Sequence, residues 1–321
     1  MLDLAPDDNL DRDFATAVLA GLSAPQMVVP ARFFYDRAGS ELFEAITRLP
    51  EYYPTRTEIA ILARHSADIA SIVGLGRAVI EFGSGSSAKT PPFLRAVAAS
   101  AYVPIDISTE FLEMAAADLA AKLPDLPVLP LSADFTRPLT LPIGVAARAK
   151  LGFFPGSTLG NLGPVAAVDL LRAFGDTLGD DSWLVIGLDL RKDTAVVEAA
   201  YNDAAGVTAA FNFNVLRRIN AELSGTIDLA AFVHDARFNH DLGRIEMHLR
   251  AVHATQFTVL GRRFALPAGA TIHTENSYKW TLDEARLLAR AGGWSPVAVW
   301  TDATDYFAVH LWRRDAAPVE P

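Results

Sequence analysis

A glycine-rich segment at residues 81–90, which reads EFGSGSSAKT, carries the strongest chemical signal in the chain. It follows directly on the apolar run 78–82, which is typical of a buried parallel strand. Glycines at the end of such a strand let the backbone approach a ligand closely. The loop by itself leaves three ligand classes open: a nucleoside triphosphate, a dinucleotide and S-adenosylmethionine.

Two of these ligand classes fit the loop less well than the third. A triphosphate loop needs a glycine before its lysine, where this chain has Ala88, although Asp189 after the run 183–188 would suit magnesium. Pro91 and Pro92 also remove two N–H donors from the helical turn that would bind phosphates. A dinucleotide loop tolerates alanine at this place, but its pyrophosphate would meet the same prolines.

Acidic residues after the next two predicted strands favour S-adenosylmethionine. Asp106 follows the apolar run 102–105, at about the 20-residue distance from the loop where a carboxylate accepts from ribose hydroxyls. Asp134 follows the run 128–131 and is placed to bind the adenine amino group, with Phe135 beside it for stacking. The simpler interpretation is that each aspartate only caps a helix.

Strands and helices must alternate for these residues to meet at one edge of a sheet. Further apolar runs at 150–154 and 183–190, with helical faces between several of the runs, predict a doubly wound α/β sheet. The alternation stops after Leu190. The remaining segments predict a long helical region, three strands of an inserted lobe, a helix, and two strands that return to the first sheet; these are residues 194–223, 244–253, 256–260, 264–266, 282–291, 297–301 and 306–312.

The N-terminal region is predicted to be mostly helical. Residues 1–14 form a loose acidic leader, helical spacing follows at 15–30, and a short helix is expected at 41–49. Thr55 and Glu58 have the spacing of a capping box, which predicts that another helix starts there. The tail at 316–321 is expected to fray.

Composition bounds the class of protein. The 321 residues are 51% hydrophobic, which suffices for about two domains. A net charge of −10 argues against a nucleic-acid partner, and no apolar run is long enough for a membrane span. The chain has no cysteine, which excludes thiolate metal sites and cysteine nucleophiles, and its seven histidines lack tight ligand spacing, so no metal is expected. The polar, acidic start is unlike a signal peptide, and we predict a cytoplasmic enzyme.

Five motifs occur in order along the chain. They are FYD with Gly39 and Ser40 (34–40), LPEYYPTR (49–56), EFGSG (81–85), FFPGSTLGNL (153–162) and YNDAAGVT (201–208). This series closely resembles the L-histidine N-alpha-methyltransferases of ergothioneine biosynthesis, over residues 15–315. The resemblance implies a Rossmann-like class I methyltransferase sheet at 60–195 plus 286–321, and an α+β substrate-binding domain at 15–59 plus 196–285.

The same resemblance implies a reaction and a set of site residues. The reaction is trimethylation of the alpha-amino nitrogen of L-histidine to hercynine, with S-adenosylmethionine as methyl donor. The cofactor residues would be Tyr35, Gly83, Lys89, Asp106, Asp134 and Phe135. The histidine residues would be Tyr52, Gly156, Asn161, Tyr201, Met247, Glu275 and Ser277.

Chemistry supports these residue types. Glu275 can accept a hydrogen bond from one imidazole N–H, and Ser277 can form a hydrogen bond with the other ring nitrogen. Met247 can pack against the ring. Tyr35 and Tyr52 are the candidates to guide the proton of the amine, which must be neutral to react. The protein is expected to act as a monomer on free histidine. The alternatives are another amino acid or aromatic amine as substrate, and a module that binds S-adenosylmethionine without catalysis.

Overall fold

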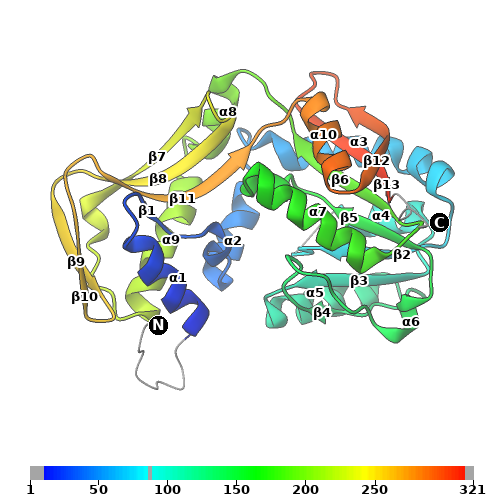
Figure 1. The fold of residues 1–321 in the computed structure, drawn as a ribbon, viewed down its shortest axis with the longest axis horizontal. Helices are drawn as coiled ribbons and strands as arrows, with labels where there is room; N and C mark the ends of the chain where they lie inside the picture. The colour runs from blue at the N-terminus through cyan, green and yellow to red at the C-terminus, as the bar shows by residue number, and fades with distance from the viewer. Residues whose placement is uncertain (1–10, 86–88, 315–321) are drawn as a thin grey trace, which may run out of the picture. The chain divides into compact units, whose positions relative to one another are not determined.

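The computed structural model describes residues 11–85 and 89–314, and the chain divides into two compact units (Figure 1). Unit 1 comprises Met1–Tyr53 and Asp193–Ser277, and unit 2 comprises Pro54–Lys192 and Tyr278–Pro321. The sequence places the three boundaries a few residues later, after 59, 195 and 285. The function of each unit stays a prediction.

Unit 2 is built on a seven-stranded sheet. In spatial order its strands are β12 (Trp294–Thr301), β13 (Phe307–Arg314), β6 (Trp183–Asp189), β5 (Lys150–Phe154), β2 (Ala78–Phe82), β3 (Ala101–Asp106) and β4 (Leu131–Ser132). The strands from β6 to β4 pair in parallel, whereas β13 runs antiparallel to both of its neighbours. The predicted doubly wound sheet is confirmed, and the last two strands do return to it.

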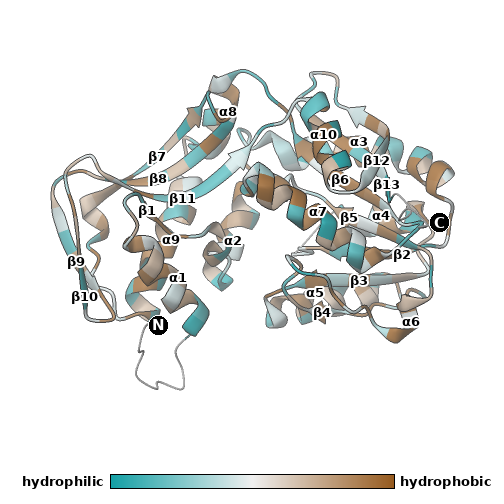
Figure 2. Ribbon diagram, in the orientation of Figure 1, coloured by the Kyte–Doolittle hydropathy of each residue, from teal (hydrophilic) through white to brown (hydrophobic). Residues whose placement is uncertain are grey.

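Helices cover both faces of this sheet. The helical elements of unit 2 are α3 (Tyr53–Val73), α4 (Thr90–Ala96), α5 (Thr109–Lys122), α6 (Ile143–Ala146), η2 (Thr158–Asn161), α7 (Pro164–Leu178) and α10 (Leu282–Ala291). Residues of α7 and α10 pack in one core with Phe82, whose ring stacks on Phe174 at 3.8 Å. Residues of α3, α4 and α5 pack in a second core, where Phe93 stacks on Phe153 at 4.4 Å. Hydrophilic and hydrophobic residues alternate along α7 (Figure 2), and its buried residues include Leu171 and Phe174.

Unit 1 combines a four-stranded sheet, a separate hairpin and several helices. The sheet has the order β1 (Met27–Val28), β11 (Thr271–Tyr278), β8 (Arg244–Ala251) and β7 (Phe232–Asn239). The hairpin joins β9 (Thr255–Val259) to β10 (Arg262–Leu266) through Leu260 and Gly261, both at positive φ, as a two-residue turn of this kind requires. The helical elements are α1 (Arg12–Leu22), η1 (Ala31–Phe34), α2 (Arg37–Ile46), α8 (Thr194–Tyr201), α9 (Val207–Glu222) and η3 (Leu229–Ala231).

Two predictions about the helices are wrong, and a third holds with a break in it. Helix α1 begins at Arg12, inside the expected leader, because Asp11 accepts a hydrogen bond from Phe14 N as its N-cap. The helical region expected at 194–223 is present as two helices, α8 and α9, because Asp203 accepts from Val207 N and Thr208 N and the N-cap Gly206 takes a left-handed φ of 73°. Helix α3 begins at Tyr53, so the pair at 55 and 58 is not a capping box.

The inserted lobe contains more strands than the sequence predicts. Its three expected strands are present as β8, β9 and β10, but the sequence does not predict β7 and β11, nor β1 in the N-terminal segment. Strand β7 mixes exposed and half-buried positions, so it lacks the clear alternation that would mark it. In the part of the chain that the structure describes, no helix is long and apolar enough to cross a membrane.

Candidate active site

The glycine loop after β2 is hydrogen-bonded to the end of β3. The N–H groups of Gly83 and Ser84 both donate to Ile105 O, at 2.8 and 3.1 Å. Gly83 has a φ of 70°, in the left-handed region that favours glycine, and its Cα lies beside the Phe135 ring, which a Cβ would meet in ordinary van der Waals contact at 3.4 Å. Residues 86–88, which include Ala88 of the motif, lie outside the described residues.

Asp106 lies beside this loop, as the sequence predicts. Its Oδ1 accepts from Ser108 N at 3.0 Å, and Gly85 N lies 3.4 Å from its Oδ2. The N-cap of α5 is Ser108 rather than Asp106. The carboxylate therefore sits at the junction of the glycine loop and the second strand, where a ribose acceptor is expected.

Asp134 and Phe135 follow β4 at the same edge. Asp134 is exposed and its Oδ1 accepts from the N–H and hydroxyl of Thr136, and no described helix starts there, so the helix-cap interpretation is wrong. The Phe135 ring is half-buried and lies edge-on to Phe82 and Phe154, at 6.3 and 6.0 Å. It thus joins the core of unit 2 to the glycine loop.

The loop has the features of a nucleoside site. Ser84 is buried, and its Oγ has no hydrogen-bond partner among the described residues. A Cβ on Gly85 would meet nothing within 4 Å, which leaves room beside the Asp106 carboxylate. An unsatisfied buried hydroxyl, an open backbone, a carboxylate and an aromatic ring fit the polar and flat parts of S-adenosylmethionine.

Glu81 lies fully buried at the end of β2, under the loop. Its carboxyl group accepts from Tyr102 Oη at 2.6 Å and from Thr90 Oγ1 at 2.9 Å. Burial raises its pKa to about 7, against the lowering effect of these two hydrogen bonds. The sequence places Glu81 in a motif but assigns it no role, whereas the structure makes it the link between β2, β3 and α4.

Lys89, a predicted cofactor residue, forms an ion pair with Glu58, the residue that the sequence predicts to be part of a capping box. Its Nζ pairs with Glu58 of α3, and both side chains are almost entirely shielded from solvent. Gly156 N, in the loop after β5, donates to both oxygens of Glu58 at 3.0 Å. Glu58 therefore contacts one predicted cofactor residue and one predicted histidine residue, and Thr55 plays no part in its contacts.

The loop after β5 carries two predicted histidine residues. Gly156 has a φ of 86°, and Asn161 ends the short helix η2 in a half-buried position. Ser157 between them also has a positive φ, 58°, and its Oγ accepts from Asp189 N at 2.9 Å. The loop is thus anchored to the end of β6.

Asp189 is not available as a magnesium ligand of the kind that the triphosphate alternative requires. Its carboxylate is buried and forms ion pairs with both Lys192 and Lys279. Burial lowers the pKa of Lys192 to about 8, although Asp189 opposes this. These lysines were not singled out in the sequence, because nothing in their spacing shows that they meet one aspartate.

Three tyrosines that are far apart in the sequence join one aromatic cluster in unit 1. The Tyr52 ring lies 6.4 Å from Tyr201, and Phe43 lies 6.2 Å from Tyr52 and 5.6 Å from Tyr35. Phe211 of α9 closes the cluster against Tyr35 at 5.7 Å. Tyr52 and Tyr201 are buried, whereas Tyr35 is 37% exposed.

The remaining predicted histidine residues lie on neighbouring strands of unit 1. Met247 is buried on β8, and its backbone oxygen accepts from Thr274 of β11 at 3.0 Å. Glu275 and Ser277 lie two residues apart on β11, so an extended strand presents them to the same side. Ser277 is buried and Glu275 is half-buried.

A histidine–glutamate cluster on this sheet was not expected. Donor atoms of Glu246, His248 and His273 lie within 4.8 Å of one another, and the two imidazole rings stack at 4.5 Å. With its proton on Nε2, His248 donates to Glu246 at 3.1 Å and accepts from Thr271. Arg244 pairs with the other oxygen of Glu246 at 2.6 Å. These contacts account for the cluster as a buried hydrogen-bond network.

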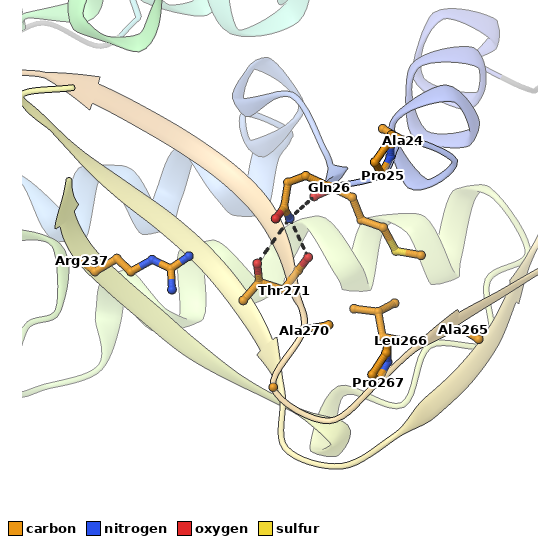
Figure 3. A pocket seen from close by; sticks show the side chains of 11 residues that line it. Ala24, Pro25, Gln26, Arg237, Ala265, Leu266, Pro267, Ala270 and Thr271 are labelled. Atoms are coloured by element: carbon orange, nitrogen blue, oxygen red, sulfur yellow. Dashed lines mark hydrogen bonds between the residues drawn. The ribbon is translucent and has the colours of Figure 1, made fainter. Parts of the chain in front are cut away.

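A pocket of about 330 Å³ opens elsewhere in unit 1 (Figure 3). Gln26 bridges its wall by donating to Thr271 O at 2.8 Å. Its lining residues are Ala24, Pro25, Gln26, Met27, Arg237, Ala265, Leu266, Pro267, Gly269, Ala270 and Thr271. No residue predicted to bind the cofactor or histidine lines this pocket.

The strand order and the loops together define the class of fold. A solved S-adenosylmethionine-dependent methyltransferase from Clostridium acetobutylicum matches 87% of this chain and 100% of its own, with a TM-score of 0.51 and 9% identity. The predicted Rossmann-like methyltransferase sheet is thereby confirmed.

The particular family follows from the sequence comparisons. The family model described as histidine-specific, SAM-dependent methyltransferase matches residues 14–314, and the chain belongs to this family. A histidine N-alpha-methyltransferase from Mycolicibacterium smegmatis is 41% identical over 300 residues, 92% of each chain. Ergothioneine biosynthesis protein 1 of Neurospora crassa is 30% identical over 88% of this chain, which spans 33% of that protein. The family predicted from the motifs is confirmed.

Proposed function

We propose that this protein transfers methyl groups from S-adenosylmethionine to the alpha-amino nitrogen of L-histidine, giving hercynine for ergothioneine biosynthesis. The observation that carries the proposal is the match of nearly the whole chain to the histidine-specific family. The relatives named as histidine N-alpha-methyltransferase and as ergothioneine biosynthesis protein 1 support the substrate and the pathway.

We assign cofactor binding to unit 2. Asp106 accepts from the ribose hydroxyls, Phe135 packs on the adenine, and Gly83 lets the backbone pass close to the ligand. This assignment is supported by the backbone hydrogen bonds between the glycine loop and the end of β3, because they place the Asp106 carboxylate beside Gly85. Asp134 and Lys89 complete the assigned set, together with Tyr35 of unit 1.

We assign recognition of histidine to Tyr52, Tyr201, Met247, Glu275 and Ser277 of unit 1, and to Gly156 and Asn161 of unit 2. Glu275 accepts from an imidazole N–H, and a substrate without that donor loses a hydrogen bond to a charged acceptor. Support comes from the burial of Met247 and Ser277 and from the clustering of Tyr52 with Tyr201.

The reaction needs alignment rather than a covalent enzyme intermediate. The bound cofactor supplies an electrophilic methyl group on sulfur. The chain must hold the amine in its neutral form, in line with that group and shielded from water. We assign the shielding to the aromatic cluster, and the handling of the amine proton to the phenol groups of Tyr35 and Tyr52. Positioning is the principal contribution, because the residues assigned to histidine recognition include no histidine or lysine that could act as a base, and the one assigned lysine, Lys89, is paired with Glu58.

We further propose that the protein acts as a monomer in the cytoplasm and on a free amino acid. Its net charge of −10 disfavours a nucleic-acid partner, because phosphate binding needs an excess of lysine and arginine.

Mass spectrometry of the products tests the proposed function directly. Incubation with S-adenosylmethionine and histidine should give trimethylhistidine, and tryptophan or tyrosine in place of histidine should give no methylated product. Methylation of another amine with histidine left unchanged would overturn the proposal.

Calorimetry with histidine and with S-adenosylhomocysteine tests the role of Glu275. Glu275→Gln should weaken histidine binding about tenfold while leaving binding of S-adenosylhomocysteine unchanged, because a neutral amide is a weaker acceptor than a carboxylate. Asp241→Asn, an exposed position between β7 and β8, is the matched control. Equal histidine affinity in both variants would contradict the assignment.

A further inference from the structure

Glu58 is a buried carboxylate of α3 that the motifs leave without a role in binding. Its side chain is 1% exposed, and the Lys89 side chain with which it pairs is 11% exposed. Gly156 N donates to both carboxylate oxygens at 3.0 Å. The carboxylate thus has a charged partner in the loop after β2 and a backbone donor in the loop after β5.

A glycine of the central sheet leaves room for the Glu58 carboxylate. A Cβ on Gly187 of β6 would lie 1.9 Å from Glu58 Oε1, and Phe307 is also within 3 Å of that position. Only glycine leaves room there, so β6 carries a gap that the Glu58 carboxylate fills. A buried ion pair that loses one partner leaves an uncompensated charge, which is strongly unfavourable. Lys89 and Glu58 therefore hold each other in place.

The two partners of Glu58 belong to two different ligand sites of the proposed function. Lys89 is assigned to the cofactor, and Gly156 lies in the loop assigned to histidine. Because the Gly156 N–H donates to the carboxylate, loss of that acceptor frees the start of the loop that leads to Asn161.

We propose that Glu58 is a positioning residue that sets Lys89 in the cofactor site and Gly156 in the histidine loop at the same time. This inference rests on the proposed function. It assigns Glu58 two separable effects: one on cofactor affinity that acts through Lys89, and one on histidine affinity that acts through the Gly156 amide.

A double-mutant cycle separates these effects. Calorimetry measures the affinities for S-adenosylhomocysteine and for histidine in the wild type, Glu58→Gln, Lys89→Met and the double variant. Glu58→Gln should lower both affinities about tenfold or more. In the Lys89→Met background the same change should lower histidine affinity again but leave S-adenosylhomocysteine affinity nearly unchanged, because the residue it acts through is gone.

Matched variants keep the test decisive. Glu113→Gln, an exposed glutamate on α5, should change neither affinity. Thermal unfolding shows that each variant is folded, and Glu58→Asp, which keeps the charge but shortens the reach, should give the same pattern if the glutamine variant does not fold. Equal losses of S-adenosylhomocysteine affinity in both backgrounds, or no loss at all, would overturn the proposal. If the wild type binds S-adenosylhomocysteine but not histidine, the proposed substrate is wrong, and the Lys89 arm still tests the role of Glu58.

Discussion

At the scale of single residues, the cofactor assignment depends on carboxylates whose surroundings differ. Asp106 is partly buried beside Gly85, whereas Asp134 is exposed and bonded to Thr136. Glu81 is fully buried and does not reach solvent. A carboxylate is therefore proposed as a ligand acceptor where solvent can reach it, as at Asp106, and links elements of the fold where it is fully buried, as at Glu81.

We expect Asp106→Asn to lower the affinity for S-adenosylhomocysteine by about 10- to 100-fold, because hydrogen bonds to a charged acceptor contribute about 1.5–3 kcal/mol. The amide oxygen can still accept from Ser108 N, so the loop should keep its shape. Calorimetry measures the affinity, and Asp118→Asn, exposed on α5, is the control. Unchanged binding would show that the ribose is held elsewhere.

At the scale of elements, the site is assembled where strands end. The loops after β2, β3 and β5 meet at one edge of a parallel sheet, and helices α3 and α4 bring Glu58 and Thr90 to the same edge. Glu81 ties three of these elements together through Tyr102 and Thr90. The strength of that tie should depend on pH.

Glu81→Gln should remove a pH dependence of stability. Burial raises the pKa of Glu81 from 4.5 to about 7, so between these values the folded chain keeps a proton that the unfolded chain has lost. The free energy of unfolding contributed by this group is therefore complete below pH 4.5 and falls as the pH rises towards 7.

Urea unfolding at pH 5 and pH 8 measures this effect. The wild type should lose on the order of 2 kcal/mol more than the variant between the two pH values. Buried His310 and His248, whose pKa values burial lowers, act in the opposite direction, but they are present in both proteins and cancel in the difference. Parallel pH profiles would contradict a raised pKa for Glu81.

At the scale of the whole molecule, each unit is assembled from separate stretches of chain. Unit 1 takes its first helices from the N-terminal part and its sheet from the segment between Asp193 and Ser277. The chain returns to unit 2 at Tyr278, and β12 and β13 complete the sheet of that unit. The proposed division of labour, with the cofactor on unit 2 and most histidine contacts on unit 1, follows this division of the chain.

Hydrogen exchange can test that division of labour. S-adenosylhomocysteine should slow amide exchange mainly at the ends of β2, β3 and β4, whereas histidine should add protection along β8 and β11. Strand β12 lies at the far edge of the unit 2 sheet and should change little with either ligand. Protection by S-adenosylhomocysteine that is confined to unit 1 would contradict the assignment.

Several features were predictable from the sequence because they depend on near neighbours. Apolar runs between helical stretches predicted the sheet, and β5 and α10 occur with the expected bounds. The ends of parallel strands gather at one edge, so Asp106 and the glycine loop were expected to lie together. The helical region after Asp193 has the expected extent, but the sequence did not predict the break in it, where Asp203 accepts from the first turn of α9 and Gly206 takes a left-handed φ.

By itself, the sequence determined the class of sheet, the family and the residues at the strand ends, since all of these follow from local patterns and ordered motifs. Only the tertiary structure decided what Glu58 does. Its partners lie 31 and 98 residues away in the sequence. A local pattern reports on neighbours within one helical turn, so a carboxylate that joins two distant loops appears only when the chain has folded.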